Sequence, residues 1–153
     1  MKLSEHFTLE EMTRSEYAIR KGIDNTPNAA IVYNLQGVCL GLEIIRKALG
    51  KSINVSSGYR SPEVNKGIGG AVTSQHTVGQ AADINVSGMT AEELYLFIKE
   101  LVDTGQLKVD QCIQEFNAWV HVSFTFTGER NEFLRANKVK GSDGIIRTVY
   151  TKD

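Results

Sequence analysis

VSSGYRSPEVNKGIGGAVTSQHTVGQAADINV, residues 55–86, is the stretch from which we interpret the rest of the chain. In it His76 follows a glycine-rich segment, and Asp83 comes seven residues later within a short apolar strand predicted over Ala81–Val86. Imidazole and carboxylate groups are both zinc ligands, and a catalytic zinc commonly takes three protein ligands and leaves one position for water. Two ligands this close in sequence therefore require a third from elsewhere.

The segment Trp119–Phe124, WVHVSF, can supply the third ligand. If it is a strand, alternation places His121 on the face opposite its two valines, so that the valines are buried and the histidine faces a site. Taken alone, His76 or Asp83 is better explained as a partly buried polar side chain or a turn cap. Together with His121 they form a set of two histidines and one aspartate without thiolates, which suits tetrahedral zinc.

Several spaced motifs resemble a known family. They are S-G-Y-R-S (57–61), S-x-H-x-x-G-x-A-x-D (74–83) and W-V-H-V-S (119–123), preceded by FTLEEMTRS (7–15) and GIDNTP (22–27). In this order they resemble the zinc D-Ala-D-Ala carboxypeptidase family, peptidase family M15, and its small phage and prophage members in particular. The likeness runs from about residue 5 to about residue 125. It implies a fold like that of hedgehog proteins and DD-peptidases, with zinc bound by His76, Asp83 and His121.

The resemblance also implies a general base. Related members and the hedgehog proteins carry a glutamate six residues before the last histidine, and Glu115 occupies that position here. Other branches place an acidic residue three before the histidine, where this chain has Ala118. Glu115 and His121 share one side of a hairpin if the turn between them has an odd number of unpaired residues. The alternative is that Glu115 is a solvated charge at a strand end.

Two further residues are candidates for substrate binding. Arg60 matches the family arginine that faces the substrate, and a guanidinium group suits a carboxylate or a developing oxyanion. It could instead form a salt bridge to Glu63 on the next turn. Ser74 resembles the family serine that helps bind the peptide, although its hydroxyl could equally serve the local turn.

Composition narrows the class of protein. The 153 residues and 16.9 kDa predict one domain, 1–153, and a formal net charge of -1 offers no basic surface for nucleic acid. No stretch approaches transmembrane length and the N-terminus lacks an apolar signal region, so we expect no membrane partner and synthesis in the cytoplasm. Cys39 and Cys112 are expected to be buried reduced thiols, His6 a surface residue, and the protein a monomer.

Periodicity and capping predict an α+β domain with a small antiparallel sheet backed by helices. Capping boxes begin helices at Thr8 and Thr90, and an apolar stripe marks a long helix. The expected helices are a short one from Thr8, Asn28–Leu49, a short one that starts at Ser61–Asn65, and Thr90–Val102. The expected strands are Lys51–Ser56, Ala81–Val86, a hairpin of Val109–Phe116 and Trp119–Phe126, and Gly144–Tyr150. We expect a flexible loop over Lys66–Ser74 and a polar stretch over Thr127–Lys140.

These features predict a zinc-dependent peptidase that hydrolyses a bond in the peptidoglycan stem peptide. The resemblance leaves open a D-Ala-D-Ala carboxypeptidase or an L-Ala-D-Glu endopeptidase, and it suggests a phage or prophage lysin that reaches the cell wall after release. One alternative is a non-catalytic zinc-containing binding domain of the same fold, against which Glu115 argues because a structural zinc needs no base. The other is a metal-free wall- or virion-binding module, which three suitably spaced ligands disfavour.

Overall fold

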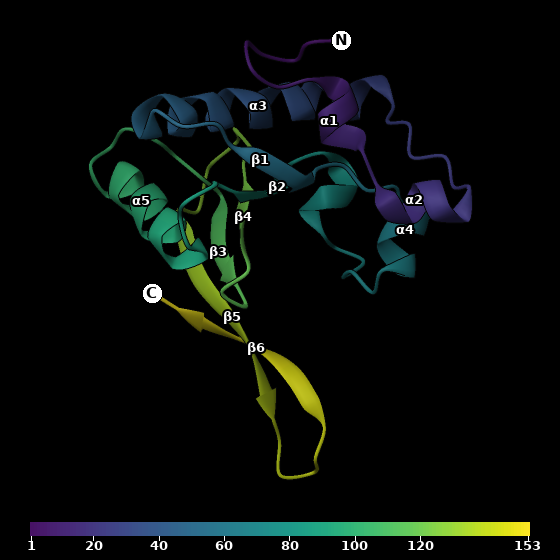
Figure 1. Ribbon diagram of the computed structural model, residues 1–153, viewed down its shortest axis with the longest axis vertical. Coiled ribbons are helices and arrows are strands. Elements are labelled where there is room, and N and C mark those ends of the chain that lie inside the picture. Colours follow the sequence, from purple (N-terminus) through teal and green to yellow (C-terminus); the bar gives the residue numbers. More distant parts are fainter.

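The computed structural model describes residues 1–153 as a mixed sheet with helices packed mainly on one of its faces (Figure 1). The elements in chain order are α1 Leu9–Thr13, α2 Glu16–Lys21, α3 Ala29–Leu49, β1 Asn54–Ser57, α4 Pro62–Gly67, the 3-10 helix η1 Gln75–Val78, β2 Ala81–Asn85, α5 Ala91–Asp103, β3 Gln111–Glu115, β4 Trp119–Ser123, β5 Glu132–Lys140 and β6 Ile146–Lys152.

The six strands form one sheet in the order β1-β2-β4-β3-β5-β6. Every neighbouring pair is antiparallel except β3 and β5, which run parallel. The α+β class predicted from the sequence is confirmed, but the sheet is larger than expected and is not wholly antiparallel. The difference lies in the stretch Thr127–Lys140, which contains β5. Its polar composition concealed the strand, because only Phe133 and Ala136 are buried within β5.

The two faces of the sheet have different surroundings. The even-numbered side chains of β2 and β4, among them Ile84, Val120 and Val122, point into a core of 24 buried residues. Helices α3 and α5 cover this face and contribute side chains to the same core. The odd-numbered side chains of these strands face the opposite way, and the candidate site lies there.

Local signals set the helix boundaries as the sequence predicted. Thr8 and Thr90 both form complete capping boxes, and Asn28 caps α3 through a 3.0 Å bond from Ile31 N–H to its Oδ1. Gly50 ends α3 in the left-handed conformation, with φ of 67°. Helix α2 and the 3-10 turn η1 were not predicted, because both are too short to show an apolar period.

The expectation that no stretch approaches transmembrane length was wrong. Helix α3 has 21 residues and is long and apolar enough, by length and composition alone, to cross a membrane. In this structure its stripe of Leu35, Val38, Leu42 and Ile45 is fully buried against the sheet. Core helices of soluble proteins have the same length and composition.

Three minor expectations are confirmed. Cys39 and Cys112 are free and fully buried, and burial raises the pKa of the Cys39 thiol to about 12. His6 lies at the surface, where its Nδ1 is 2.7 Å from Glu43 Oε1.

Strands β5 and β6 extend well past the rest of the sheet. In Figure 1 their hairpin projects from the body of the protein on the side opposite α3. Seven residue pairs join the two strands, from Leu134 opposite Lys152 to Lys140 opposite Ile146. The root of the hairpin lies beside β3, where Ile113 pairs with Leu134.

Candidate metal centre

Two of the three predicted ligands are brought together by strand register. Asp83 on β2 lies directly opposite His121 on β4, so both side chains leave the same face of the sheet. His76 approaches from η1, and all three residues are buried. Their candidate ligand atoms form a small triangle. His76 Nε2 is 3.1 Å from Asp83 Oδ1 and 3.2 Å from His121 Nδ1, and the remaining side is 3.2 Å.

The backbone around His76 fixes which of its ring nitrogens faces the triangle. Ser74 caps η1 by accepting a 3.2 Å bond from His76 N–H, and Gly79 ends it with φ of 73°. His76 Nδ1 is 2.6 Å from the carbonyl oxygen of Gly58, which can only accept, so Nδ1 carries the proton and Nε2 is free to bind a metal. Gly58 must be glycine, because a Cβ there would lie 2.2 Å from the carbonyl oxygen of Met12.

The donor set fits a zinc ion. Ligand atoms bound at zinc distances in a tetrahedron lie about 3.3–3.5 Å apart, close to the three sides observed. With the tautomer set by Gly58, His76 presents a lone pair to a carboxylate oxygen and to a second imidazole nitrogen. Two acceptors, His76 Nε2 and Asp83 Oδ1, thus converge in a buried site, and a cation bound between them would stabilise both.

The ionisation states also suit a metal. Burial lowers the pKa of His76 and favours its neutral form, which is the form that binds metals. Burial opposes ionisation of Asp83 as well, but the neighbouring His76 and His121 outweigh it and hold the pKa of Asp83 below its usual value. The site therefore combines two imidazole donors with one permanent negative charge.

Glu115 lies beside the triangle. In the β3–β4 hairpin Ile113 pairs with His121 and Glu115 with Trp119, which leaves the three residues 116–118 unpaired. The turn thus has an odd number of unpaired residues, which places Glu115 and His121 on the same side of the hairpin as predicted. Glu115 Oε1 is 4.0 Å from His121 Nδ1. Burial, and then the charge of Asp83, raise the pKa of Glu115.

Arg60 faces the same cleft and forms no salt bridge with Glu63. Its Nε is buried without a hydrogen-bond partner. Burial lowers the pKa of Arg60, whereas the charges of Asp83 and Glu115 act in the opposite direction. A buried guanidinium donor without a partner inside the protein is positioned to receive an acceptor from a ligand.

These residues line one cleft with a volume of about 790 Å³. The ligand triangle, Glu115, Arg60 and Ser74 all border it. Trp119 is also in its wall. Sequence reasoning missed other wall residues, among them Arg130, Leu134 and Tyr150. No motif marks them, since Arg130 precedes the unpredicted strand β5, Leu134 lies on it and Tyr150 pairs with it.

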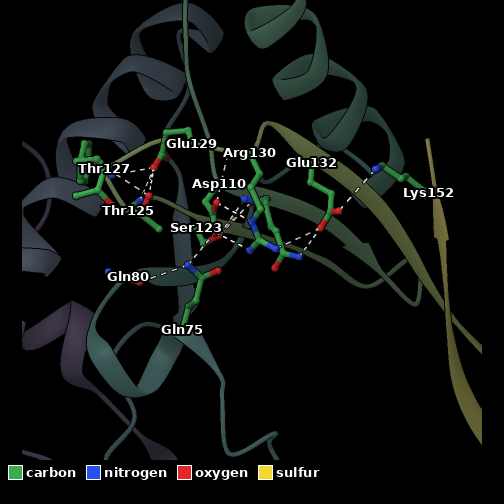
Figure 2. A network of polar contacts seen from close by, with 12 residues as sticks. Gln75, Gln80, Asp110, Ser123, Thr125, Thr127, Glu129, Arg130, Glu132 and Lys152 are labelled. Atoms are coloured by element: carbon green, nitrogen blue, oxygen red, sulfur yellow. Dashed lines mark hydrogen bonds and ion pairs between the residues drawn. The ribbon is translucent and has the colours of Figure 1, made fainter.

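A polar network supports the cleft behind η1 (Figure 2). Buried Asp110 accepts two bonds from Arg130, 2.9 Å from Nε and 2.7 Å from Nη2, and a third of 3.0 Å from Gln75 Nε2. Gln75 directly precedes the ligand His76. Asp110 thereby ties the 3-10 turn to the segment that leads into β5.

Together, three convergent ligands, a half-buried carboxylate beside them and an open cleft are the arrangement of a mononuclear metallopeptidase centre. A family model described as Peptidase M15 matches residues 5–123, so the chain belongs to the Peptidase M15 family of zinc-dependent peptidases. The match spans every ligand, Glu115 and Arg60, and it ends at β4. A comparison with curated proteins found no match.

The geometry predicts one zinc ion per chain. Alanine at His76, Asp83 or His121 should each abolish stoichiometric binding, because two remaining donors do not make a zinc site. Glu115→Gln, a matched change beside the triangle, should leave the metal bound. Elemental analysis after gel filtration measures the occupancy. Stoichiometric zinc in any two of the three alanine variants would exclude this site.

The Asp110 network predicts a pH-dependent contribution to stability. Hydrogen bonds from Arg130 hold the pKa of Asp110 below its ordinary value. Its stabilisation is therefore present above the unfolded-state pKa of about 3.9 and is lost as pH falls through the lower folded-state value. Asp110→Asn should cost about 1–2 kcal/mol at pH 7, and the gap from wild type should narrow below pH 4.

The exposed pair Asp143–Arg147 provides a control with the same chemistry. Arg147 Nη2 is 2.7 Å from Asp143 Oδ2, but the pair lies in solvent at the hairpin turn. Asp143→Asn should change stability little at any pH, because exposed ion pairs are weakly stabilising. Thermal melts of both variants between pH 3 and pH 7 compare them. A constant gap between Asp110→Asn and wild type would contradict the linkage.

Proposed function

We propose that the protein hydrolyses a peptide bond in the stem peptide of bacterial peptidoglycan. The single observation that carries this proposal is the placement of half-buried Glu115 4.0 Å from His121 in a three-ligand site that borders an open cleft. The phage-type motifs of the N-terminal half support a lysin that acts on the cell wall after release from the cytoplasm. The substrate fits the family resemblance and the size of the cleft.

The residues divide the chemistry between them. His76, Asp83 and His121 would hold a zinc ion, which would supply the Lewis acidity that makes water more acidic and a carbonyl more electrophilic. Glu115 accepts the proton of the attacking water, and burial favours this role by raising its pKa above the ordinary value. After attack, Glu115 returns the proton to the leaving amine.

Arg60 is placed to bind the negative charge of the substrate. Its unpartnered Nε can donate either to the oxyanion that develops at the attacked carbonyl or to a terminal carboxylate. The first role suits cleavage of an internal bond and the second suits removal of a terminal D-Ala. We favour cleavage of an internal bond, because the loop after α4, from Ile68 to Ser74, lines the cleft and contains no charged side chain.

The non-catalytic zinc domain is the competing function. A binding domain would require the ligand triangle but not Glu115, and the partial burial of this carboxylate costs stability. The two functions therefore differ in what Glu115 does.

Replacing Glu115 separates catalysis from metal binding. Glu115→Gln preserves shape but cannot accept a proton, so turnover of purified peptidoglycan should fall about a hundredfold or more. Zinc content should be unchanged, and Glu63→Gln, an exposed change on α4, should be fully active. Product release measured by mass spectrometry gives the rates. Near wild-type activity in Glu115→Gln would remove Glu115 as the base, and no activity in the wild type would favour the binding domain.

A pair of substrates distinguishes the two roles of Arg60. Free-acid and C-terminally amidated muropeptides should be cleaved alike if Arg60 contacts the attacked carbonyl, and Arg60→Ala should slow both. If Arg60 clamps a terminal carboxylate, amidation should cost about 1.5–3 kcal/mol in kcat/KM, and Arg60→Ala should erase the preference. Strong discrimination against the amidated substrate would overturn the internal cut.

A further inference from the structure

The C-terminal hairpin builds one end of the cleft. The family match ends at residue 123, yet Leu134 on β5 and Tyr150 on β6 both line the cavity that holds the metal ligands. Strand register explains how they reach it. Glu115 pairs with Ala136, and Ala136 pairs in turn with Tyr150. The three side chains form one row across β3, β5 and β6 on the cleft face of the sheet.

Nothing bulky separates Tyr150 from Glu115 within this row. Ala136, which lies between them, is fully buried and contributes only a methyl group to the row. Burial, and then the charge of Glu115, raise the pKa of Tyr150, as expected for a phenol close to a carboxylate. The side chain is nevertheless 56% exposed, so much of its ring remains available for contact with a ligand.

Five apolar or aromatic side chains line the cleft and form an apolar wall: Ile113, Phe116, Trp119, Leu134 and Tyr150. In the strand order β1-β2-β4-β3-β5-β6, the ligand strands β2 and β4 lie between β1, which Arg60 follows, and the hairpin strands. A peptide that crosses the metal ligands from Arg60 toward the hairpin therefore places one flanking residue against the apolar wall.

The hairpin also holds the rest of that wall in place. Phe116 stands in the β3–β4 turn with φ of 57°, and its N–H donates a 2.9 Å bond to the carbonyl oxygen of Ala136. Lys138 on β5 places its Nζ 4.8 Å from the centre of the Phe116 ring, which packs edge-on against Trp119 at 5.7 Å. The hairpin thus supplies two wall residues and supports two others.

We propose that the β5–β6 hairpin completes a subsite for an apolar side chain of the peptide substrate, and that Tyr150 sets the size of the side chain accepted. The inference rests on the proposed function and deepens it. The ligand is a peptide residue with a small aliphatic side chain next to the cleaved bond. Tyr150 is a specificity residue here, with no part in proton transfer.

The test compares two adjacent residues that face opposite sides of the hairpin. Tyr150 faces the cleft, whereas Val149, paired with Asn137, faces away. Synthetic stem peptides carrying alanine, valine or leucine on either side of the cleaved bond serve as substrates. Tyr150→Ala should lower kcat/KM about tenfold for the alanine peptide and shift the preference toward leucine at one of the two positions. Val149→Ala, a smaller truncation at the neighbouring position of the same strand, should keep the wild-type profile.

Tyr150→Phe separates the ring from its hydroxyl and should retain the wild-type preference. If Tyr150→Ala and Val149→Ala share the wild-type side-chain profile, the subsite is excluded. A uniform loss over all three side chains in Tyr150→Ala would also overturn the proposal, because it would show a general role instead of size selection.

A second measurement does not depend on turnover. Trp119 is the sole tryptophan of the chain and lies in the apolar wall, so its fluorescence reports occupancy of this end of the cleft. Titration with the three peptides should give weaker binding of the alanine peptide to Tyr150→Ala than to wild type. If the wild type cleaves no stem peptide, the proposed function fails, and the titration still decides the subsite. Identical titrations for the two proteins would exclude it.

Discussion

The opposition of Asp83 and His121 across β2 and β4 is the constraint on which the rest of the site depends. A one-residue slip of either strand would turn one ligand into the core and bring a core side chain to the site face. The core prevents that slip, because Ile84, Val120 and Val122 are fully buried on the other side of the same strands. The packing of helices α3 and α5 on the sheet therefore fixes the positions of Asp83 and His121, although neither helix lines the cleft.

The third ligand is held by a different device. His76 lies in a short 3-10 turn whose own hydrogen bonds are few, and a turn of this length is not stable by itself. Its position comes from tertiary contacts on both sides. The Gly58 carbonyl orients the ring, while the Asp110 network holds the neighbouring Gln75. Both partners come from strand ends, so the rigidity of the sheet extends to the ligand that is not on a strand.

Much of this centre could be predicted from the sequence, because its signals are local. The spacing of His76 and Asp83 and the alternation around His121 depend only on the neighbouring residues, and the odd-numbered turn after Glu115 follows from the chain length between two strands. Strand β5 could not be predicted in the same way, although its partner β6 was expected as the strand Gly144–Tyr150. Strand β5 pairs in parallel with β3, a non-local contact, and most of its side chains are polar because the sheet leaves the core at that point.

The cleft also combines residues that local sequence signals reveal with residues that only non-local contacts bring there. The catalytic centre combines residues whose spacing within the family-matched segment fixes their geometry. The apolar wall is completed by residues that no spacing rule connects to that segment, and it rests on a hairpin with few buried side chains. Substitutions on the exposed hairpin disturb the core little, whereas substitutions near the ligand triangle disturb both the core and the metal. Strand β6 can therefore vary without loss of the metal centre, and this freedom makes its cleft-facing residues suited to set which peptide is bound while the ligands and Glu115 remain as they are.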